Sequence, residues 1–225
     1  MRKFTEKLIL VLLLVLVTTS FQQDKVKILI IGDSISIGYT PFVIENLENI
    51  AVVFHNPGNA QHTATGLANI DAWIGDTDWD IIQFNWGLWD VCYRHPDSKQ
   101  QGNRDKINGL ITFNTDDYGK NLDSIVKLIR KKSDAELIFV TTTYIPDDDA
   151  GRYKEDAVKY NKIAKIIMAA NDVKVNDIYE KSVEIHHEFG KGIHDVHYSK
   201  EGYRKLGWLI SDYLTHKIEQ LSNKD

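Results

Sequence analysis

The sequence lacks three features that would each assign it to a particular class of protein. Cys92 is the only cysteine in 225 residues, so no disulfide can form within the chain and no cysteine-rich metal site exists. Basic residues are not in excess, since 27 Lys and Arg against 32 Asp and Glu give a formal net charge of −5. The chain therefore lacks the basic surface of a general nucleic-acid binder. It also has no internal repeat, low-complexity tract or interdomain linker, and its length and 43% hydrophobic content predict one globular domain.

The first 20 residues have the pattern of a secretory signal peptide. Basic residues at positions 2, 3 and 7 precede an apolar run over residues 8–17, and small residues follow at positions 18–20. The apolar run is short for a permanent membrane-spanning helix. We therefore predict a signal peptide over residues 1–20, a folded domain over residues 26–221 and a secreted or periplasmic protein without a stable membrane span after processing. An uncleaved N-terminal anchor is the alternative.

Strand and helix patterns alternate along the rest of the chain. Short apolar runs, typical of strands buried in a parallel sheet, occur at residues 26–31, 51–55, 80–85, 136–142 and 173–175. Helical patterns occur at residues 63–73, 113–132, 152–171 and 201–221, and a further helix is expected to begin near Thr40. The alternation predicts a flavodoxin-like three-layer α/β/α sandwich with a parallel sheet of about five strands. Polar residues 91–112 interrupt the pattern and predict a long insertion, either functional or a surface excursion.

One polar cluster follows the first predicted strand, where open parallel sheets place their sites. It consists of Gly32, Asp33 and Ser34. A serine in such a strand-to-helix turn can present its hydroxyl to a cleft, and its backbone N–H can face an oxyanion because a helix start leaves amides unpaired. The simpler interpretation is that Asp33 or Ser34 only caps the helix.

A second polar cluster precedes the last predicted helix. His197 could act as the base that a serine nucleophile needs, and Asp195 could hold the tautomer of that histidine. Here too a simpler interpretation exists, in which Ser199 caps the helix and the histidines are ordinary loop residues. A zinc site made of His194, Asp195 and His197 is a weaker alternative, because no other ligand motif supports it.

Together these clusters resemble the SGNH branch of the GDSL esterase/lipase superfamily, over residues 26–214. The serine block of that family is matched at residues 32–34, its glycine block after the second strand by Gly58, and its last block by Asp195 and His197. The resemblance implies an ester hydrolase in which Ser34 is the nucleophile, His197 the base and Asp195 the residue that orients it. It also implies that the backbone N–H groups of Ser34 and Gly58 bind the oxyanion, and that no metal or organic cofactor takes part.

Two positions depart from the family pattern. Trp89 stands where the family has an oxyanion-binding asparagine, and we expect Asn85, at the end of the third strand, to take over as donor. The alternative is that Asn85 only ends the strand. The family acid usually lies three residues before the histidine, where this chain has His194. Asp195 remains the best candidate for the acid, and a Ser–His dyad is the alternative.

Aromatic residues near the expected site favour a carbohydrate substrate. Trp86, Trp89 and Tyr93, with Tyr144 after the fourth strand, could stack on sugar rings, although such rings also pack in cores. We predict an exported serine esterase that removes O-acetyl groups from a carbohydrate or small-molecule ester. Two alternatives are a lipid or thioester hydrolase or acyltransferase of the same fold, and a non-catalytic carbohydrate-binding protein on a decayed esterase scaffold.

Overall fold

A computed structural model describes residues 25–223, and the predicted signal peptide lies outside them. At its centre is a parallel sheet with the strand order β2-β1-β3-β6-β7. Its strands are β1 (Val26–Ile31), β2 (Ala51–His55), β3 (Ile81–Phe84), β6 (Glu136–Val140) and β7 (Lys174–Asn176). The order reverses between β1 and β3, which in open α/β sheets is where ligands bind. The predicted three-layer fold with five parallel strands is confirmed.

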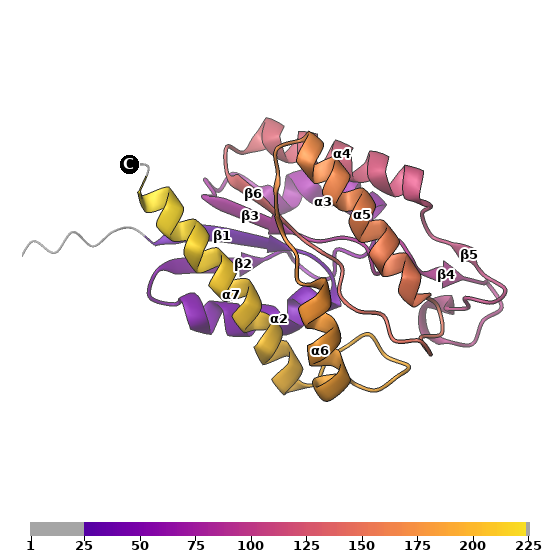
Figure 1. The fold of residues 1–225 in the computed structure, drawn as a ribbon. Coiled ribbons are helices and arrows are strands. Elements are labelled where there is room, and N and C mark those ends of the chain that lie inside the picture. Colours follow the sequence, from indigo (N-terminus) through magenta and orange to yellow (C-terminus); the bar gives the residue numbers. More distant parts are fainter. Residues whose placement is uncertain (1–24, 224–225) are drawn as a thin grey trace, which may run out of the picture.

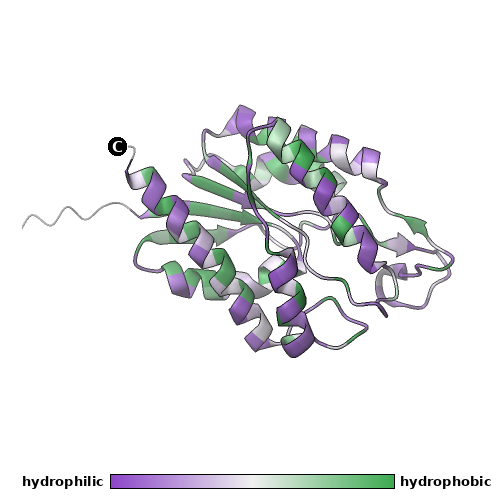
Figure 2. Ribbon diagram, in the orientation of Figure 1, coloured by the Kyte–Doolittle hydropathy of each residue, from purple (hydrophilic) through white to green (hydrophobic). Residues whose placement is uncertain are grey.

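Helices cover both faces of this sheet (Figure 1). One face carries α2 (Ser34–Leu47) and α7 (Lys200–Ser222), and the other carries α3 (Thr63–Ile74), α4 (Thr115–Lys132) and α5 (Lys154–Ala170). The strands are mostly apolar, whereas the helices alternate apolar and polar residues (Figure 2), as expected of a sheet buried between amphipathic layers. Within residues 25–223, no helix is long and apolar enough to cross a bilayer.

Two helices differ from the sequence prediction. Helix α2 begins at Ser34 instead of near Thr40, because the Asp33 side chain accepts a hydrogen bond from the Ile35 N–H at 2.9 Å and caps the helix there. Helix α6 (Tyr179–Phe189) was not predicted. The last helix begins as expected, with Ser199 as its N-cap.

The packing of α2 against α7 brings the two polar clusters together. A Cβ added to Gly38 would lie 2.2 Å from the Tyr203 ring, and one added to Gly207 would lie 2.7 Å from Phe42, so the two helices approach closely. Further along, Asn46 donates to Ser211 at 3.1 Å. All three pairs are separated by 165 residues (203 − 38, 207 − 42 and 211 − 46), so α2 and α7 run parallel. The same offset places the start of α7 beside Ser34.

The predicted insertion at residues 91–112 forms its own small structure. It contains the antiparallel strands β4 (Tyr93–Arg94) and β5 (Leu110–Ile111) and the 3-10 helix η1 (Gln101–Asn103). This structure projects beyond the carboxyl ends of the central strands (Figure 1). It therefore stands on the side of the sheet where the site is expected.

Candidate active site

Ser34 is the first residue of α2, in the turn that follows β1. The turn is tight, because a Cβ added to Gly32 would lie 2.6 Å from the Ser36 hydroxyl. In the first turn of a helix the backbone N–H groups have no intrahelical acceptor. The turn therefore presents both the hydroxyl and the free N–H of Ser34 at the carboxyl end of the sheet.

Ser34, His197 and Asp195 form a continuous chain of hydrogen bonds. The Ser34 Oγ lies 2.9 Å from the His197 Nε2, and the His197 Nδ1 lies 2.5 Å from an Asp195 carboxylate oxygen. The same oxygen accepts the backbone N–H of His197 at 3.0 Å. Because an ionised carboxylate can only accept, Nδ1 carries the ring proton and Nε2 accepts from the Ser34 hydroxyl. This is the geometry in which an imidazole can remove the serine proton.

The environment of Asp195 keeps its carboxyl group ionised. Partial burial acts to raise the pKa of Asp195, but the hydrogen bonds from the backbone and ring of His197 outweigh it and leave the pKa lowered. A charged carboxylate at this position can stabilise an imidazolium formed at His197.

The loop that carries Asp195 is held by a residue that the sequence analysis missed. His186, on α6, donates its Nε2–H to the Asp195 carbonyl at 2.7 Å, and its buried ring packs edge-on against Tyr144 and Tyr198. His194, considered as an alternative occupant of the acid position, is exposed and contacts the Asp148 carbonyl at 3.1 Å. Asp195, not His194, therefore faces His197.

The loop that carries Gly58 is fixed to the nucleophile turn by its neighbour Asn56. The Asn56 side chain accepts the Gly32 N–H at 2.9 Å and donates to the Gly58 carbonyl at 3.2 Å, while the Ala60 N–H donates to the Gly32 carbonyl at 2.9 Å. Gly58 has a φ of +69°, a conformation that favours glycine. A Cβ added to Gly58 would meet nothing within 4 Å, so the backbone there faces open space.

Asn85 lies at the end of β3, next to the same turn. A Cβ added to Gly32 would lie 3.8 Å from the Asn85 Cβ, and the Asn85 backbone N–H donates to Ile31 at 2.9 Å. One side-chain N–H donates to the Val140 carbonyl at 2.7 Å. The second N–H has no partner among the described residues, so the amide retains one donor.

The three aromatic residues predicted to contact substrate have different environments. Trp86 is fully buried, its ring N–H donates to the Ala60 carbonyl at 3.2 Å, and it packs against Gly66. A substrate cannot reach this ring, so the predicted stacking role of Trp86 is wrong. Trp89 and Tyr93 are both half-buried, and the Arg94 guanidinium lies 4.9 Å from the centre of the Trp89 ring.

Two carboxyl groups beneath the site are buried. Burial raises the pKa of Asp33, against the lowering effects of the Ile35 N–H and of the positive charge of Arg152. Burial also raises the pKa of Asp90 to about 7, although hydrogen bonds from the Thr63 N–H and hydroxyl act to lower it. One carboxyl oxygen of each, Asp33 Oδ2 and Asp90 Oδ2, has no hydrogen-bond partner among the described residues.

Arg152 ties the loop after β3 to the loop before α5. It is buried, and its guanidinium donates to the Leu88 carbonyl at 2.6 Å and pairs with the buried Asp149 at 3.2 Å. Sequence analysis did not identify this arginine, because one of its two partners, Leu88, lies 64 residues away along the chain. Over residues 25–223, no group of three or more His, Cys, Asp or Glu side chains is arranged to hold a metal ion.

Comparison with known proteins shows similarity at the level of structure. No protein-family model and no curated protein matches the sequence. An acetyl xylan esterase, AlAXEase, superposes with a TM-score of 0.66 at 15% identity, over 84% of this chain and 99% of that one. A member of the lipolytic G-D-S-L family from Veillonella parvula gives 0.60 at 20% identity, over 84% and 98%. Axe2, an acetylxylan esterase from Geobacillus stearothermophilus, gives 0.63 at 15% identity, over 85% and 93%. Two catalytic mutants of Axe2, in which a serine and an aspartate are replaced by alanine, are similar to this chain as well.

Proposed function

We propose that this protein, whose fold is that of the SGNH/GDSL hydrolases, is a serine esterase. The observation that carries the proposal is the hydrogen-bond chain from Ser34 through His197 to Asp195. The fold is compatible with many functions, so the argument depends on this site. The catalytic mutants of Axe2 at a serine and an aspartate support the same division of roles.

The proposed reaction proceeds through a covalent intermediate on Ser34. The Ser34 oxygen bonds to the ester carbonyl carbon while its proton passes to the Nε2 of His197, and Asp195 stabilises the resulting imidazolium. The carbonyl oxygen becomes an oxyanion that accepts hydrogen bonds from the N–H groups of Ser34 and Gly58 and from the Asn85 amide. The alcohol leaves with the proton from His197. Water then attacks the carbonyl carbon of the acyl group while one of its protons passes to His197. The bond to the Ser34 oxygen breaks, that oxygen takes the proton back from His197, and the carboxylic acid leaves.

The substrate class that we propose is an O-acetylated carbohydrate. Two of the similar structures are acetyl xylan esterases. Trp89, in the loop after β3, and Tyr93, on β4, are both half-buried and could stack on a sugar. Export through the N-terminal segment, which would bring the enzyme to an extracellular polysaccharide, belongs to the same proposal.

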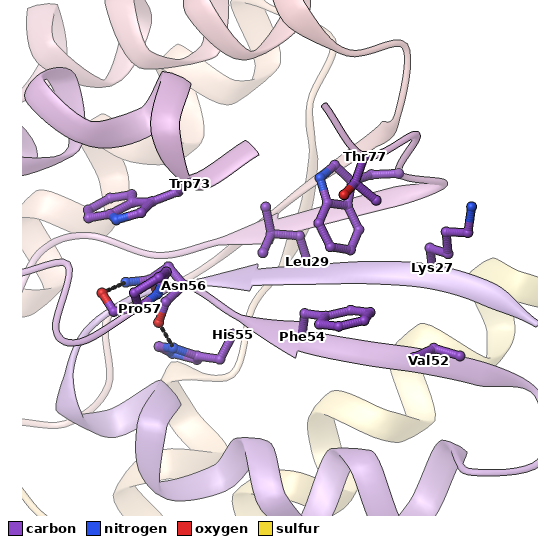
Figure 3. A pocket seen from close by; sticks show the side chains of 10 residues that line it. Lys27, Leu29, Val52, Phe54, His55, Asn56, Pro57, Trp73 and Thr77 are labelled. Carbon is purple, nitrogen blue, oxygen red and sulfur yellow. Dashed lines mark hydrogen bonds between the residues drawn. The ribbon is translucent and has the colours of Figure 1, made fainter. Parts of the chain in front are cut away.

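An apolar cavity along β1 and β2 does not favour a lipid substrate. Figure 3 shows this cavity, of about 390 Å³, along β1 and β2, with Leu29, Val52 and Phe54 on its floor. A lipid hydrolase would need an apolar groove beside the insertion. No residue of the insertion at 91–112 lines this cavity.

A covalent probe and a product assay test the proposal together. Wild-type protein should react with a fluorophosphonate and release acetate from acetylated xylo-oligosaccharides, whereas Ser34→Ala should do neither. Ser124→Ala, which changes an exposed serine on α4, is the matched control and should behave as wild type. Lack of labelling of the wild type would instead favour the non-catalytic binding protein. Labelling without acetate release would leave the serine hydrolase standing and exclude the proposed substrate.

A further inference from the structure

His55 forms a second serine–histidine pair next to the first. It is the last residue of β2 and is half-buried. Its Nε2 lies 2.7 Å from the Ser36 Oγ, and its Nδ1 lies 2.8 Å from the Asn56 carbonyl oxygen. Figure 3 shows the contact with Asn56 at the end of the apolar cavity. Nothing in the reaction described above uses His55 or Ser36.

The partners of His55 determine which ring nitrogen carries its proton. A carbonyl oxygen can only accept, so the proton toward Asn56 is on Nδ1. Burial lowers the pKa of His55, against the opposing effect of the Asn56 carbonyl, which favours a neutral ring. In a neutral ring with Nδ1 protonated, Nε2 must accept, and the Ser36 hydroxyl is the donor that faces it. Lys27 lines the same cavity, and the backbone carbonyl of Asp33 faces the Ser36 hydroxyl.

The Ser36 hydroxyl has one proton and two acceptors within reach. They are the His55 Nε2 at 2.7 Å and the Asp33 carbonyl at 2.8 Å. The Asp33 carbonyl also accepts the Ile37 N–H at 3.0 Å, so it stays paired when Ser36 donates to His55. The neutral His55 ring therefore links β2 to the first turn of α2 without leaving a buried group unpaired.

We propose that His55 is a positioning residue that fixes the distance between the two backbone donors of the oxyanion site. Through Ser36 it holds the first turn of α2, which carries the Ser34 N–H. Through the Asn56 carbonyl it holds the loop whose Asn56 side chain already binds the Gly32 N–H and the Gly58 carbonyl. This proposal rests on the proposed esterase function, because it assigns His55 a role in that reaction.

Three variants test the proposal by kinetics on 4-nitrophenyl acetate. His55→Phe removes both hydrogen bonds, and we expect kcat to fall about ten- to a hundredfold with KM nearly unchanged, because displaced donors weaken transition-state binding. His55→Gln keeps one donor and one acceptor and should recover most of kcat. His216→Gln, at an exposed histidine of α7, is the control and should match wild type. A wild-type kcat in His55→Phe would overturn the proposal, whereas absence of turnover in wild type would overturn the proposed function instead.

A measurement that needs no turnover tests the same geometry. In Ser34→Ala protein at neutral pH, ¹⁵N NMR of the imidazole rings should show the His55 proton on Nδ1, and Ser36→Ala should shift the Nε2 resonance. A proton on Nε2 in the neutral ring would overturn the proposal, because the link to Asn56 would then be absent. This second measurement also covers the case in which His55→Phe fails to fold.

Discussion

The two halves of the candidate site differ in burial and in the contacts that hold them in place. The nucleophile half consists of residues 32–36, 55–60 and 85–90, which directly follow β1, β2 and β3. Asp33 and Asn56 in this half are buried, Ser34 and Asn85 are half-buried, and backbone hydrogen bonds join its loops. The base half consists of residues 190–199, where the side chains of His197 and Asp195 are 34% and 40% exposed.

The two halves also differ in how their surroundings shift the pKa of a carboxyl group. In the nucleophile half, burial raises the pKa of Asp33 and of Asp90, so this half disfavours negative charge on its own carboxyl groups. In the base half, hydrogen bonds from His197 overcome burial and lower the pKa of Asp195. The sheet therefore positions the proposed nucleophile and oxyanion donors, while a partly exposed loop supplies His197 and Asp195, the pair proposed to move the proton.

The largest effect on kcat should come from removing the negative charge of Asp195 in the base half. Asp195→Asn should lower kcat by about a thousandfold or more, because the amide no longer enforces the reactive tautomer of His197 or stabilises its cation. The melting temperature should change little, since the side chain is 40% exposed. Near-normal turnover on 4-nitrophenyl acetate would show that Ser34 and His197 work as a dyad.

A smaller effect is expected from the side-chain donor of the nucleophile half. Asn85→Ala should lower kcat on the order of a hundredfold, the usual cost of losing one oxyanion donor. Thermal unfolding measured in parallel accounts for the lost bond to Val140. If turnover is unchanged, Asn85 only closes the end of β3 and the backbone donors suffice.

The buried carboxyl groups should give stability a pH dependence of their own. Because the folded pKa of Asp90 is raised to about 7, the folded state binds its proton more tightly than the unfolded state, and stability falls as pH rises through that range. In the wild type, this effect should lower the free energy of unfolding by on the order of 2 kcal/mol between about pH 5 and about pH 8. In Asp90→Asn that decrease should be absent. Urea unfolding of both proteins at the two pH values measures this. The pKa of Asp195 is shifted in the opposite direction, so its contribution to stability is present at neutral pH and is lost in acid. If the free energy of unfolding has the same pH dependence in Asp90→Asn and in the wild type, the expected difference between the two halves of the site is contradicted.

The smallest effect concerns the sugar itself. Trp89→Ala should raise KM for acetylated xylo-oligosaccharides by up to about tenfold, the range of one lost aromatic contact, and should leave KM for 4-nitrophenyl acetate unchanged. Tyr213→Ala, on α7 and away from the site, is a control for loss of a partly buried ring. An equal rise in KM for both substrates would remove the assigned stacking role.

Local patterns in the sequence were sufficient for the fold and for the residues of the base half. Most strands of the central sheet are short apolar runs that could be identified without their partners, and Asp195 and His197 lie two residues apart in one loop. The position of Trp86 could not be predicted in this way. It lies in a motif that also contains the half-exposed Trp89, and only the packing of α3 against it shows which ring is buried.

Two of the residues missed by sequence analysis have at least one partner on a different element of the fold. Arg152 binds the carbonyl of Leu88, and His55 bonds to Ser36 on a neighbouring element. Such contacts depend on which loops meet at the end of the sheet, and no spacing within the sequence records this. The start of α2 was misplaced for a different reason, because Asp33 could equally be interpreted as part of the turn or as the helix cap.

The parallel register of α2 and α7 also determines when the proposed enzyme can first act. The nucleophile is synthesised early, whereas His197 and the helix that brings it to Ser34 come from the end of the chain, 163 residues later. A ribosome-bound or truncated chain that has not yet docked α7 on α2 would hold a serine without its base. Hydrolysis would therefore report that the final helix has docked.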